Sequence, residues 1–213
     1  GMDKIFSKWV FLARGISTPK YCDFPSYEAL EKHGFDLYFP FPAVVKPSGE
    51  GSSVGVQIVK NAEELKRAAQ EAGRLKGSIL VEQYVKGREI QVAVLDDEAL
   101  GAIEIVPAEG YEFYDYAAKY QSTGNKYLFP APLPEAQYRE VCETALAAHR
   151  ALGCAGATRS DLILDEGGKA WLLEINTLPG MTNASLLPKI AAGRGIDFDS
   201  LCERLLLGAS LKA

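Results

Sequence analysis

Alternating apolar and polar positions predict an α+β lobe in the first part of the chain. Strand-like patterns occupy residues 41–47, 56–59 and 79–85. A loop rich in glycine and serine, residues 48–55, joins the first two of these strands. The short spacing between the first two strands favours a pair linked directly by this loop.

Three helices are predicted around these strands from their capping residues and apolar spacing. The first runs from Asp3 to Gly15 and the second from Ser26 to Lys32. The third follows Asn61, with a glutamate three residues later as in a capping box, and its apolar positions recur at helical spacing up to residue 72.

The second half of the chain predicts a hairpin, a long irregular segment and further α+β structure. Residues 89–95 and 99–106 form the expected hairpin, and residues 107–134 show little periodicity. An irregular segment of this length is uncommon in a compact domain unless it has a function. A helix over residues 135–152 and a late pair of strands follow.

Composition narrows the function classes mainly by exclusion. The chain has 213 residues, of which 47% are hydrophobic and 24% charged, as in soluble globular proteins. No apolar run approaches the roughly 20 residues of a membrane span. A net charge of −5 argues against a nucleic-acid partner. Four cysteines without a CxxC pair and the absence of a signal peptide are typical of a cytoplasmic protein.

Metal chemistry based on histidine is also excluded, because the chain has only two histidines. His149 falls on the apolar face of the helix at 135–152, so we expect it to be packed at the edge of the core. Any metal site in this chain must therefore rely on oxygen ligands.

The late hairpin carries the strongest chemical signal. Suppose that Gly167 and Gly168 form a two-residue turn, or that the loop has four residues; both alternatives give the same pairing. Asp161 then lies opposite Glu174, and Arg159 lies opposite Asn176. Strand alternation places these four side chains on one face of the sheet.

Two facing carboxylates beside an amide oxygen call for a cation. Like charges directly opposite each other destabilise a strand pair, and hard oxygen ligands suit Mg²⁺ or Mn²⁺. The alternative is a solvated surface on which Arg159 offsets the acids. The apolar residues between the acids favour the metal site.

The Gly/Ser loop after Lys46 is the second signal. Gly49, Gly51 and Gly55 permit positive φ and close approach to a ligand, and the serines add donors for phosphate oxygens. It is neither a Walker A loop nor a Rossmann fingerprint. The alternative is an ordinary hairpin loop.

A third signal is Glu82 at the end of a predicted strand, with Glu89 close behind. Such carboxylates can accept hydrogen bonds from a ribose hydroxyl or an adenine amino group, and the intervening backbone can contact adenine. Together the three signals describe a nucleotide held between two α+β lobes, residues 2–89 and 90–213.

The motifs in this order closely resemble those of D-alanine–D-alanine ligases of the ATP-grasp superfamily, from residue 2 nearly to the C-terminus. They are Met2-Asp3-Lys4, Val45-Lys46-Pro47-Ser48, Glu50-Gly51-Ser52-Ser53-Val54-Gly55, Phe113-Tyr114-Asp115-Tyr116, Lys119-Tyr120, Arg159-Ser160-Asp161, Leu173-Glu174-Ile175-Asn176-Thr177 and Pro179-Gly180-Met181-Thr182.

The resemblance implies a role for each matching position. Phosphates of ATP would contact Lys4 and Lys46, and Ser53 and Lys119 would also belong to the ATP site, Lys119 on the loop that closes over it. The adenosine site would be lined by Glu82, Gln83, Tyr84, Val85 and Glu89. Two Mg²⁺ (or Mn²⁺) ions would be held by Asp161, Glu174 and Asn176. Catalysis would use Arg159, Gly180, Ser52 and Tyr120, and the D-alanine substrates would contact Tyr114, Arg159, Gly180, Ser185 and Leu186.

In that family a D-alanine carboxylate attacks the γ-phosphate of ATP, and the amine of a second D-alanine displaces phosphate from the acyl phosphate, for peptidoglycan synthesis. Residues 107–134 are the expected lid. The family's N-terminal domain, which binds the first D-alanine and often mediates a homodimer, has no expected counterpart here. The alternatives are a non-catalytic Mg-ATP-binding module and an ATP-grasp ligase for another amino acid.

Overall fold

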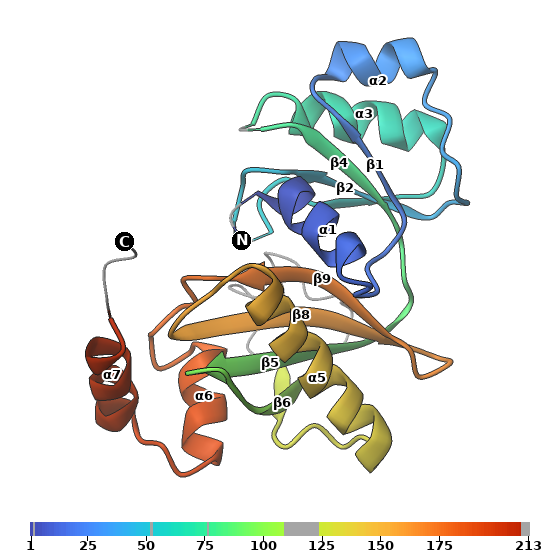
Figure 1. The fold of residues 1–213 in the computed structure, drawn as a ribbon. Helices are drawn as coiled ribbons and strands as arrows, with labels where there is room; N and C mark the ends of the chain where they lie inside the picture. The colour runs from blue at the N-terminus through green and yellow to red at the C-terminus, as the bar shows by residue number, and fades with distance from the viewer. Residues whose placement is uncertain (2, 52, 76, 109–123, 210–213) are drawn as a thin grey trace.

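The computed structural model describes residues 1, 3–51, 53–75, 77–108 and 124–209, and these form two lobes, each with its own antiparallel sheet (Figure 1). The first sheet has the strand order β1-β4-β2-β3, and the second has the order β7-β6-β5-β8-β9. In chain order the elements are α1 Lys4–Ala13, β1 Tyr21–Phe24, α2 Tyr27–His33, β2 Ala43–Pro47, β3 Gln57–Val59, α3 Ala62–Ala72, β4 Ile79–Gln83, β5 Gly87–Leu95, β6 Glu98–Val106, β7 Lys126–Leu128, α5 Glu135–Ala151, β8 Ala157–Asp165, β9 Ala170–Asn176, α6 Leu186–Gly193 and α7 Phe198–Leu207.

The first lobe packs α2 and α3 on one face of its sheet. Alternation along β2 buries Ala43 and Val45 against Leu65 of α3, whereas Val44 and Lys46 face the other way, toward the second lobe. Helix α3 begins at the predicted cap: the Asn61 side chain accepts a hydrogen bond from the backbone N–H of Glu64 at 2.9 Å.

The second lobe uses both faces of its sheet. On one face α5 covers Ile90, Val92, Leu162 and Leu172, and on the other face α6 covers Leu95 and neighbouring residues. Strands β8 and β9 are the part of this sheet that lies nearest the first lobe (Figure 1). Asp161 of β8 and Glu174 of β9 line a cleft whose walls also include residues of the first lobe.

Helix α1 lies at the junction of the two lobes (Figure 1). Its N-cap Asp3 accepts hydrogen bonds from the backbone N–H groups of Ile5 and Phe6, as predicted. Phe11 is fully buried in the core of the second lobe, beneath α5. The helix therefore packs on the second lobe although it precedes the first in sequence.

The predicted division into residues 2–89 and 90–213 stays a proposal, and two observations bear on it. Strand β5 begins at Gly87, which pairs with Asp165 of β8, so residues 87–89 belong to the second sheet. The core of the second lobe also includes Phe11.

Two strands were missed by the sequence analysis. Strand β1 is four residues long and pairs with β4, and β7 is three residues long, pairs with β6 and lies inside the segment predicted to be irregular. Both occupy sheet edges, where a strand needs only one partner. Runs of three or four residues are too short to show a reliable alternation.

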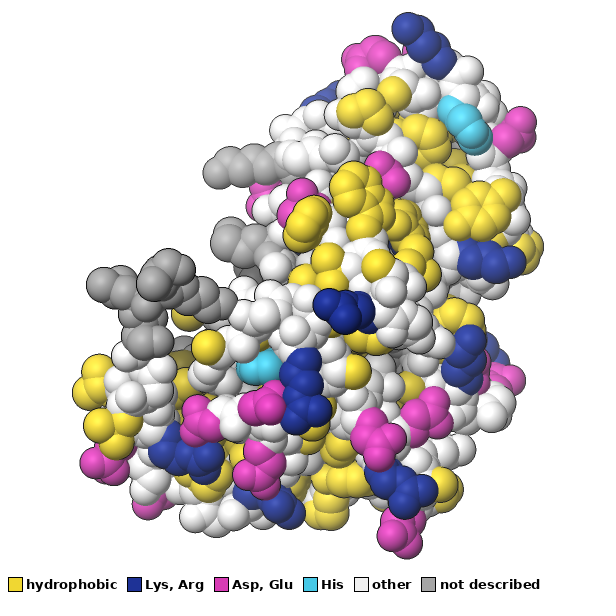
Figure 2. Space-filling model, viewed as in Figure 1, with side chains coloured by type: hydrophobic (Ala, Val, Ile, Leu, Met, Phe, Trp, Pro, Cys, Tyr) yellow, Lys and Arg dark blue, Asp and Glu magenta, His cyan; other side chains and the backbone are white. Residues whose placement is uncertain are grey.

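The surface shows mixed charge and a group of exposed apolar side chains on α1. Acidic and basic side chains are interspersed over the second lobe in the view of Figure 2, whereas hydrophobic side chains group over α1. These include Phe6, Trp9 and Leu12, which are each about half exposed. Within the described ranges, no helix is both long and apolar enough to cross a membrane.

Candidate functional site

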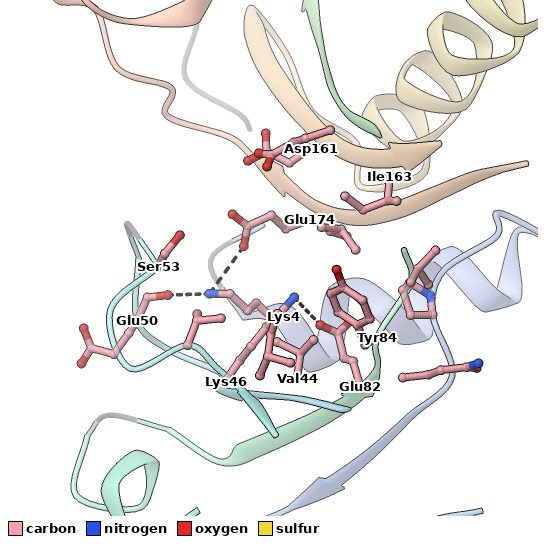
Figure 3. A pocket seen from close by; sticks show the side chains of 17 residues that line it. Lys4, Val44, Lys46, Glu50, Ser53, Glu82, Tyr84, Asp161, Ile163 and Glu174 are labelled. Carbon is pink, nitrogen blue, oxygen red and sulfur yellow. Dashed lines mark hydrogen bonds and ion pairs between the residues drawn. The ribbon is translucent and has the colours of Figure 1, made fainter. Parts of the chain in front are cut away.

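A cleft with a volume of about 140 Å³ lies between the two sheets and contains most of the predicted site residues (Figure 3). Its walls combine apolar side chains from both lobes with charged groups at one end. The lining residues are Lys4, Pro19, Val44, Lys46, Glu50, Ser53, Val56, Ile58, Glu82, Gln83, Tyr84, Val85, Glu89, Asp161, Ile163, Leu173 and Glu174. Apolar walls of this kind suit a flat aromatic base, and the charged end suits a polar group.

The Gly/Ser loop connects two strands that pair directly, β2 and β3, so it is a hairpin loop that also lines the cleft. Of its predicted flexible glycines, Gly55 does adopt a left-handed φ of +70°, and an added Cβ there would lie 2.6 Å from Leu75. Gly51 does not have positive φ, whereas Ser53 does, at +59°. Of the three glycines predicted to permit positive φ, only Gly55 adopts it.

Lys4 links the loop to the second lobe. Its Nζ donates to the backbone carbonyl of Glu50 at 2.5 Å and lies 3.6 Å from Oε2 of Glu174 (Figure 3). The Lys4 side chain is 12% exposed, so these contacts form inside the cleft. Lys4 thus brings a positive charge to the boundary between the loop of the first lobe and an acid of the second.

Glu82 forms ion pairs with two lysines. Its carboxylate contacts Nζ of Lys46, from the neighbouring strand β2, and Nζ of Lys8, from α1. Burial acts to raise the pKa of Glu82, but the two ammonium groups outweigh it and lower this pKa to about 2. Burial likewise acts to lower the pKa of Lys46, and the Glu82 carboxylate more than reverses that.

These contacts give Glu82 partners that the sequence analysis did not identify. The sequence predicts that Glu82 accepts hydrogen bonds from a ribose or an adenine. In the structure both oxygens of its carboxylate contact lysines. Glu82 still lines the cleft, so a role in nucleotide binding remains a proposal.

For the late hairpin, the predicted pairing of the acidic residues is confirmed, but the predicted length of the turn is wrong. Asp161 is paired with Glu174, and Arg159 with Asn176. The turn, however, has three residues: the N–H of Asp165 donates to the carbonyl of Lys169, and Gly168 takes the left-handed φ of +83°.

A β-bulge reconciles these two registers. Leu162 pairs with Leu172 and Asp161 with Glu174, so Leu173 is an extra residue on β9. Because an extra residue changes which face the following side chains occupy, Leu172 is buried under α5 while both Leu173 and Glu174 line the cleft.

Asp161 is held by Arg159, two residues before it on the same face of β8. Nε of Arg159 donates to one carboxylate oxygen at 2.9 Å and Nη2 to the other at 3.1 Å. Burial alone would lower the pKa of Arg159, but the Asp161 carboxylate raises it above its ordinary value. Nδ2 of Asn176 lies 3.4 Å from Asp161 Oδ1, which completes the group.

The donor set at this face fits a hard cation. Among the described residues, no group of three or more His, Cys, Asp or Glu side chains is arranged to hold a metal ion. The two carboxylates of Asp161 and Glu174 and the amide oxygen of Asn176 make a smaller set. Mg²⁺ commonly uses one or two carboxylates and completes its shell with water and substrate phosphates. In the present arrangement Arg159 and Lys4 offset the two acids.

The predicted second-substrate residues lie beyond β9. Gly180 is exposed in the loop before α6, and an added Cβ would lie 2.7 Å from Oγ of Ser185, the N-cap of that helix. The side chain of Leu186 is 5% exposed and packs in the core with Ile190. Leu186 can therefore contact a ligand only through its backbone.

Four predicted site residues lie outside the described residues: Ser52, Tyr114, Lys119 and Tyr120. Most of the proposed lid, residues 109–123, lies outside them too. His149 is described and is packed as expected: it is 2% exposed, and its Nδ1 lies 2.8 Å from Oγ1 of Thr158.

The sequence analysis missed Lys8, Ile163 and Leu173. Lys8 follows Lys4 by four residues, so both side chains lie on one face of α1, and this spacing could have revealed it. Ile163 follows Asp161 by two residues on the same strand, so strand alternation places both side chains on one face. Leu173 reaches the cleft only because of the bulge, and no local pattern indicates that.

The comparisons with known proteins agree with this geometry. The family model described as "D-ala D-ala ligase C-terminus" matches residues 10–207. The chain belongs to the D-alanine–D-alanine ligase family. It is 57% identical over its whole length to a D-alanine–D-alanine ligase of Anaeromyxobacter sp. (strain Fw109-5) and 50% identical to one of Geobacter sulfurreducens. It spans 68% and 66% of those two relatives, about two thirds of their length.

Solved structures of family members share the fold. The D-alanine–D-alanine ligase of Bacillus anthracis complexed with ATP has a TM-score of 0.78 at 33% identity, with 97% of this chain and 66% of that one covered. The VanG D-Ala:D-Ser ligase of Enterococcus faecalis has a TM-score of 0.83 at 31% identity, with 96% and 60% covered. The predicted ATP-grasp fold with two α+β lobes is thereby confirmed for this member of the D-alanine–D-alanine ligase family.

Proposed function

We propose that this chain is the ATP-grasp portion of an ATP-dependent ligase that forms D-alanyl-D-alanine for peptidoglycan synthesis. The observation that supports it most is the meeting of lysines from α1 and β2 with acids from β8 and β9 in one cleft. Lys4, Lys46 and Ser53 would bind the phosphates of ATP. The nucleoside would lie among Gln83, Tyr84, Val85 and the carboxylates of Glu82 and Glu89.

Asp161, Glu174 and Asn176 would hold Mg²⁺ or Mn²⁺. Such an ion, when bound, neutralises phosphate charge and orients the phosphate oxygens. Lys4, Lys46 and Ser53 would hold the phosphates so that the γ-phosphate lies at the charged end of the cleft, where a carboxylate nucleophile can reach it. Ser52 and Tyr120 are proposed to act in catalysis and Lys119 in ATP binding, together with the lid expected from the sequence at residues 107–134.

The ligation itself has two steps in this proposal. A carboxylate oxygen of the first D-alanine attacks the γ-phosphorus, and ADP leaves. The amine of the second D-alanine then attacks the acyl carbon, loses a proton, and phosphate leaves. Arg159 and the Gly180 N–H would stabilise the developing oxyanion, and Tyr114, Ser185 and the Leu186 backbone would position D-alanine.

A second candidate function is Mg-ATP binding without ligation, and a third is ligation to another amino acid. The similarity to the structure of a D-Ala:D-Ser ligase is the observation that supports the third candidate. A cytoplasmic location and a homodimer remain predictions from the sequence.

One set of measurements on the 213-residue chain separates these candidates. Titration calorimetry measures Mg-ATP binding, and phosphate release is then followed with D-alanine, D-serine or no amino acid. D-alanine-dependent phosphate release with D-alanyl-D-alanine detected by mass spectrometry supports the ligase. Binding without amino-acid-dependent release supports the second candidate, and a preference for D-serine supports the third. No Mg-ATP binding would overturn all three candidates.

A further inference from the structure

Lys8 is the only charged side chain among the largest fully buried side chains of the described residues, with 0% exposure. Its Nζ forms an ion pair with Glu82 and donates a hydrogen bond to Oγ1 of Thr18 at 2.5 Å. It also lies 5.3 Å from the ring centroid of Tyr21 on β1. Burying an ammonium group is costly unless it is paired, so a lysine at this place needs a reason.

Lys8 does not itself line the cleft, whereas its partner Glu82 does. Glu82 is 1% exposed and contacts Lys8 on one side and Lys46 on the other. One carboxylate therefore serves two ammonium groups, and the trio carries one net positive charge. Of these two lysines, only Lys46 lines the cleft, so the uncompensated charge is available there.

We propose that Lys8 is a positioning residue that neutralises Glu82 and thereby leaves the Lys46 ammonium free to bind a nucleotide phosphate. The inference rests on the proposed function, because it concerns the same nucleotide site. Without Lys8, Glu82 would pair with Lys46 alone. The pair would then be neutral, and a phosphate would have to compete with Glu82 for Lys46.

The position of Lys8 on α1 supports this role. Lys4, one turn earlier on the same helix, reaches Glu174 of the second lobe, and Lys8 reaches Glu82 on β4 of the first sheet. Phe11 follows Lys8 by three residues, slightly less than one helical turn, and is anchored in the core of the second lobe. The same helix thus supplies one cation to the cleft and one counterion beneath it.

The test compares affinities for Mg-ATP and for adenosine, which has no phosphate, by titration and competition calorimetry. The Lys8→Met variant keeps an unbranched side chain that is only one heavy atom shorter, and it removes the charge. We expect Mg-ATP affinity to fall about tenfold, equivalent to about 1.4 kcal/mol, with adenosine affinity within about twofold. The exposed Lys20 lies in the neighbouring segment, and Lys20→Met is the matched control, expected to change neither value.

A second substitution separates positioning from structural support. In the double variant Lys8→Met/Glu82→Gln the competing carboxylate is removed, so the ratio of ATP to adenosine affinity should return toward that of the wild type. A purely structural Lys8 would lower both affinities together and leave the ratio unchanged, and that result would overturn the inference.

Two further outcomes are distinct. Normal Mg-ATP binding by a folded Lys8→Met variant overturns the role of Lys8 and leaves the proposed function intact. Failure of the wild-type chain to bind Mg-ATP overturns both. If Lys8→Met does not fold, Thr18→Val removes only the hydrogen bond to Lys8, and we expect the affinity ratio to fall about twofold to threefold; an unchanged ratio counts against the proposal.

Discussion

Asp161 and Glu174 lie directly opposite each other because β9 contains one extra residue. The pairing set by the three-residue turn, Leu164 with Ala170 and Leu162 with Leu172, would continue to pair Asp161 with Leu173. The bulge at Leu173 shifts the partner to Glu174 and turns Glu174 to the cleft. Two acids thus face each other across the pair, an arrangement that costs stability unless a cation is near.

The first prediction concerns the metal ligands. Replacing Glu174 by Gln keeps the shape of the side chain and removes one carboxylate from the pair, so Mg-ATP affinity should fall at least about tenfold. Thermal stability should change little, since repulsion between two facing acids is relieved at the same time. Calorimetry with Mg-ATP measures the affinity, and a thermal melt checks the fold.

Glu166→Gln is the matched control for that experiment. Glu166 lies in the turn of the same hairpin and pairs with Lys86 at 2.9 Å, with both side chains about three-quarters exposed. We expect no measurable change in Mg-ATP affinity. Equal affinities of the Glu174 and Glu166 variants would contradict the assignment of Glu174 to the metal.

The second prediction concerns Arg159. Lysine keeps the positive charge but cannot make the two parallel hydrogen bonds that now hold Asp161. If the proposed ligation occurs, Arg159→Lys should lower D-alanine-dependent phosphate release about 100-fold, with Mg-ATP affinity within about threefold. A matching loss of ATP affinity would instead assign Arg159 to nucleotide binding alone.

The third prediction is a pH dependence of stability from Glu82. Its pKa falls from 4.5 to about 2 on folding, so its ionised form stabilises the protein above the unfolded pKa, and this contribution is lost as pH falls toward 2. At about 1.4 kcal/mol per pKa unit the full contribution is roughly 3 kcal/mol.

Urea unfolding of the wild type and Glu82→Gln tests this dependence. The difference in their free energies of unfolding should be constant between pH 8 and about 6 and should shrink below about pH 4.5. Some difference should persist at low pH, because the variant leaves Lys8 and Lys46 without their carboxylate. A difference that does not change down to pH 3 would show that Glu82 has an ordinary pKa.

The fourth prediction concerns the anchoring of α1. Phe11 is fully buried in the core of the second lobe, so Phe11→Ala should lower the free energy of unfolding by about 3–5 kcal/mol. Phe6, on the same helix, is 56% exposed, and Phe6→Ala should change it by less than about 0.5 kcal/mol. Denaturant unfolding monitored by circular dichroism measures both; equal effects would mean that α1 is not anchored through Phe11.

Local patterns were sufficient for the helices and for the long strands. Asp3, Ser26 and Asn61 each cap a helix through a side-chain oxygen, and these signals lie within three or four residues of the helix they start. The long strands β5, β6 and β8 alternate over enough residues to be recognised. The short edge strands β1 and β7 do not, because their existence depends on a partner that is distant in sequence.

The family, the two-lobed α+β architecture and the pairing of Asp161 with Glu174 could be predicted from the amino-acid sequence, because motif order, capping and alternation are recorded in neighbouring residues. The three-dimensional arrangement was needed to show that a bulge produces this pairing, that α1 packs on the second lobe, and that Lys8 and Lys46 share the Glu82 carboxylate. The ion pair of Lys8 with Glu82 joins residues 74 positions apart, and α1 and β9 lie still farther apart in sequence. Whether an ammonium group is buried beside a carboxylate depends on how such separate elements pack.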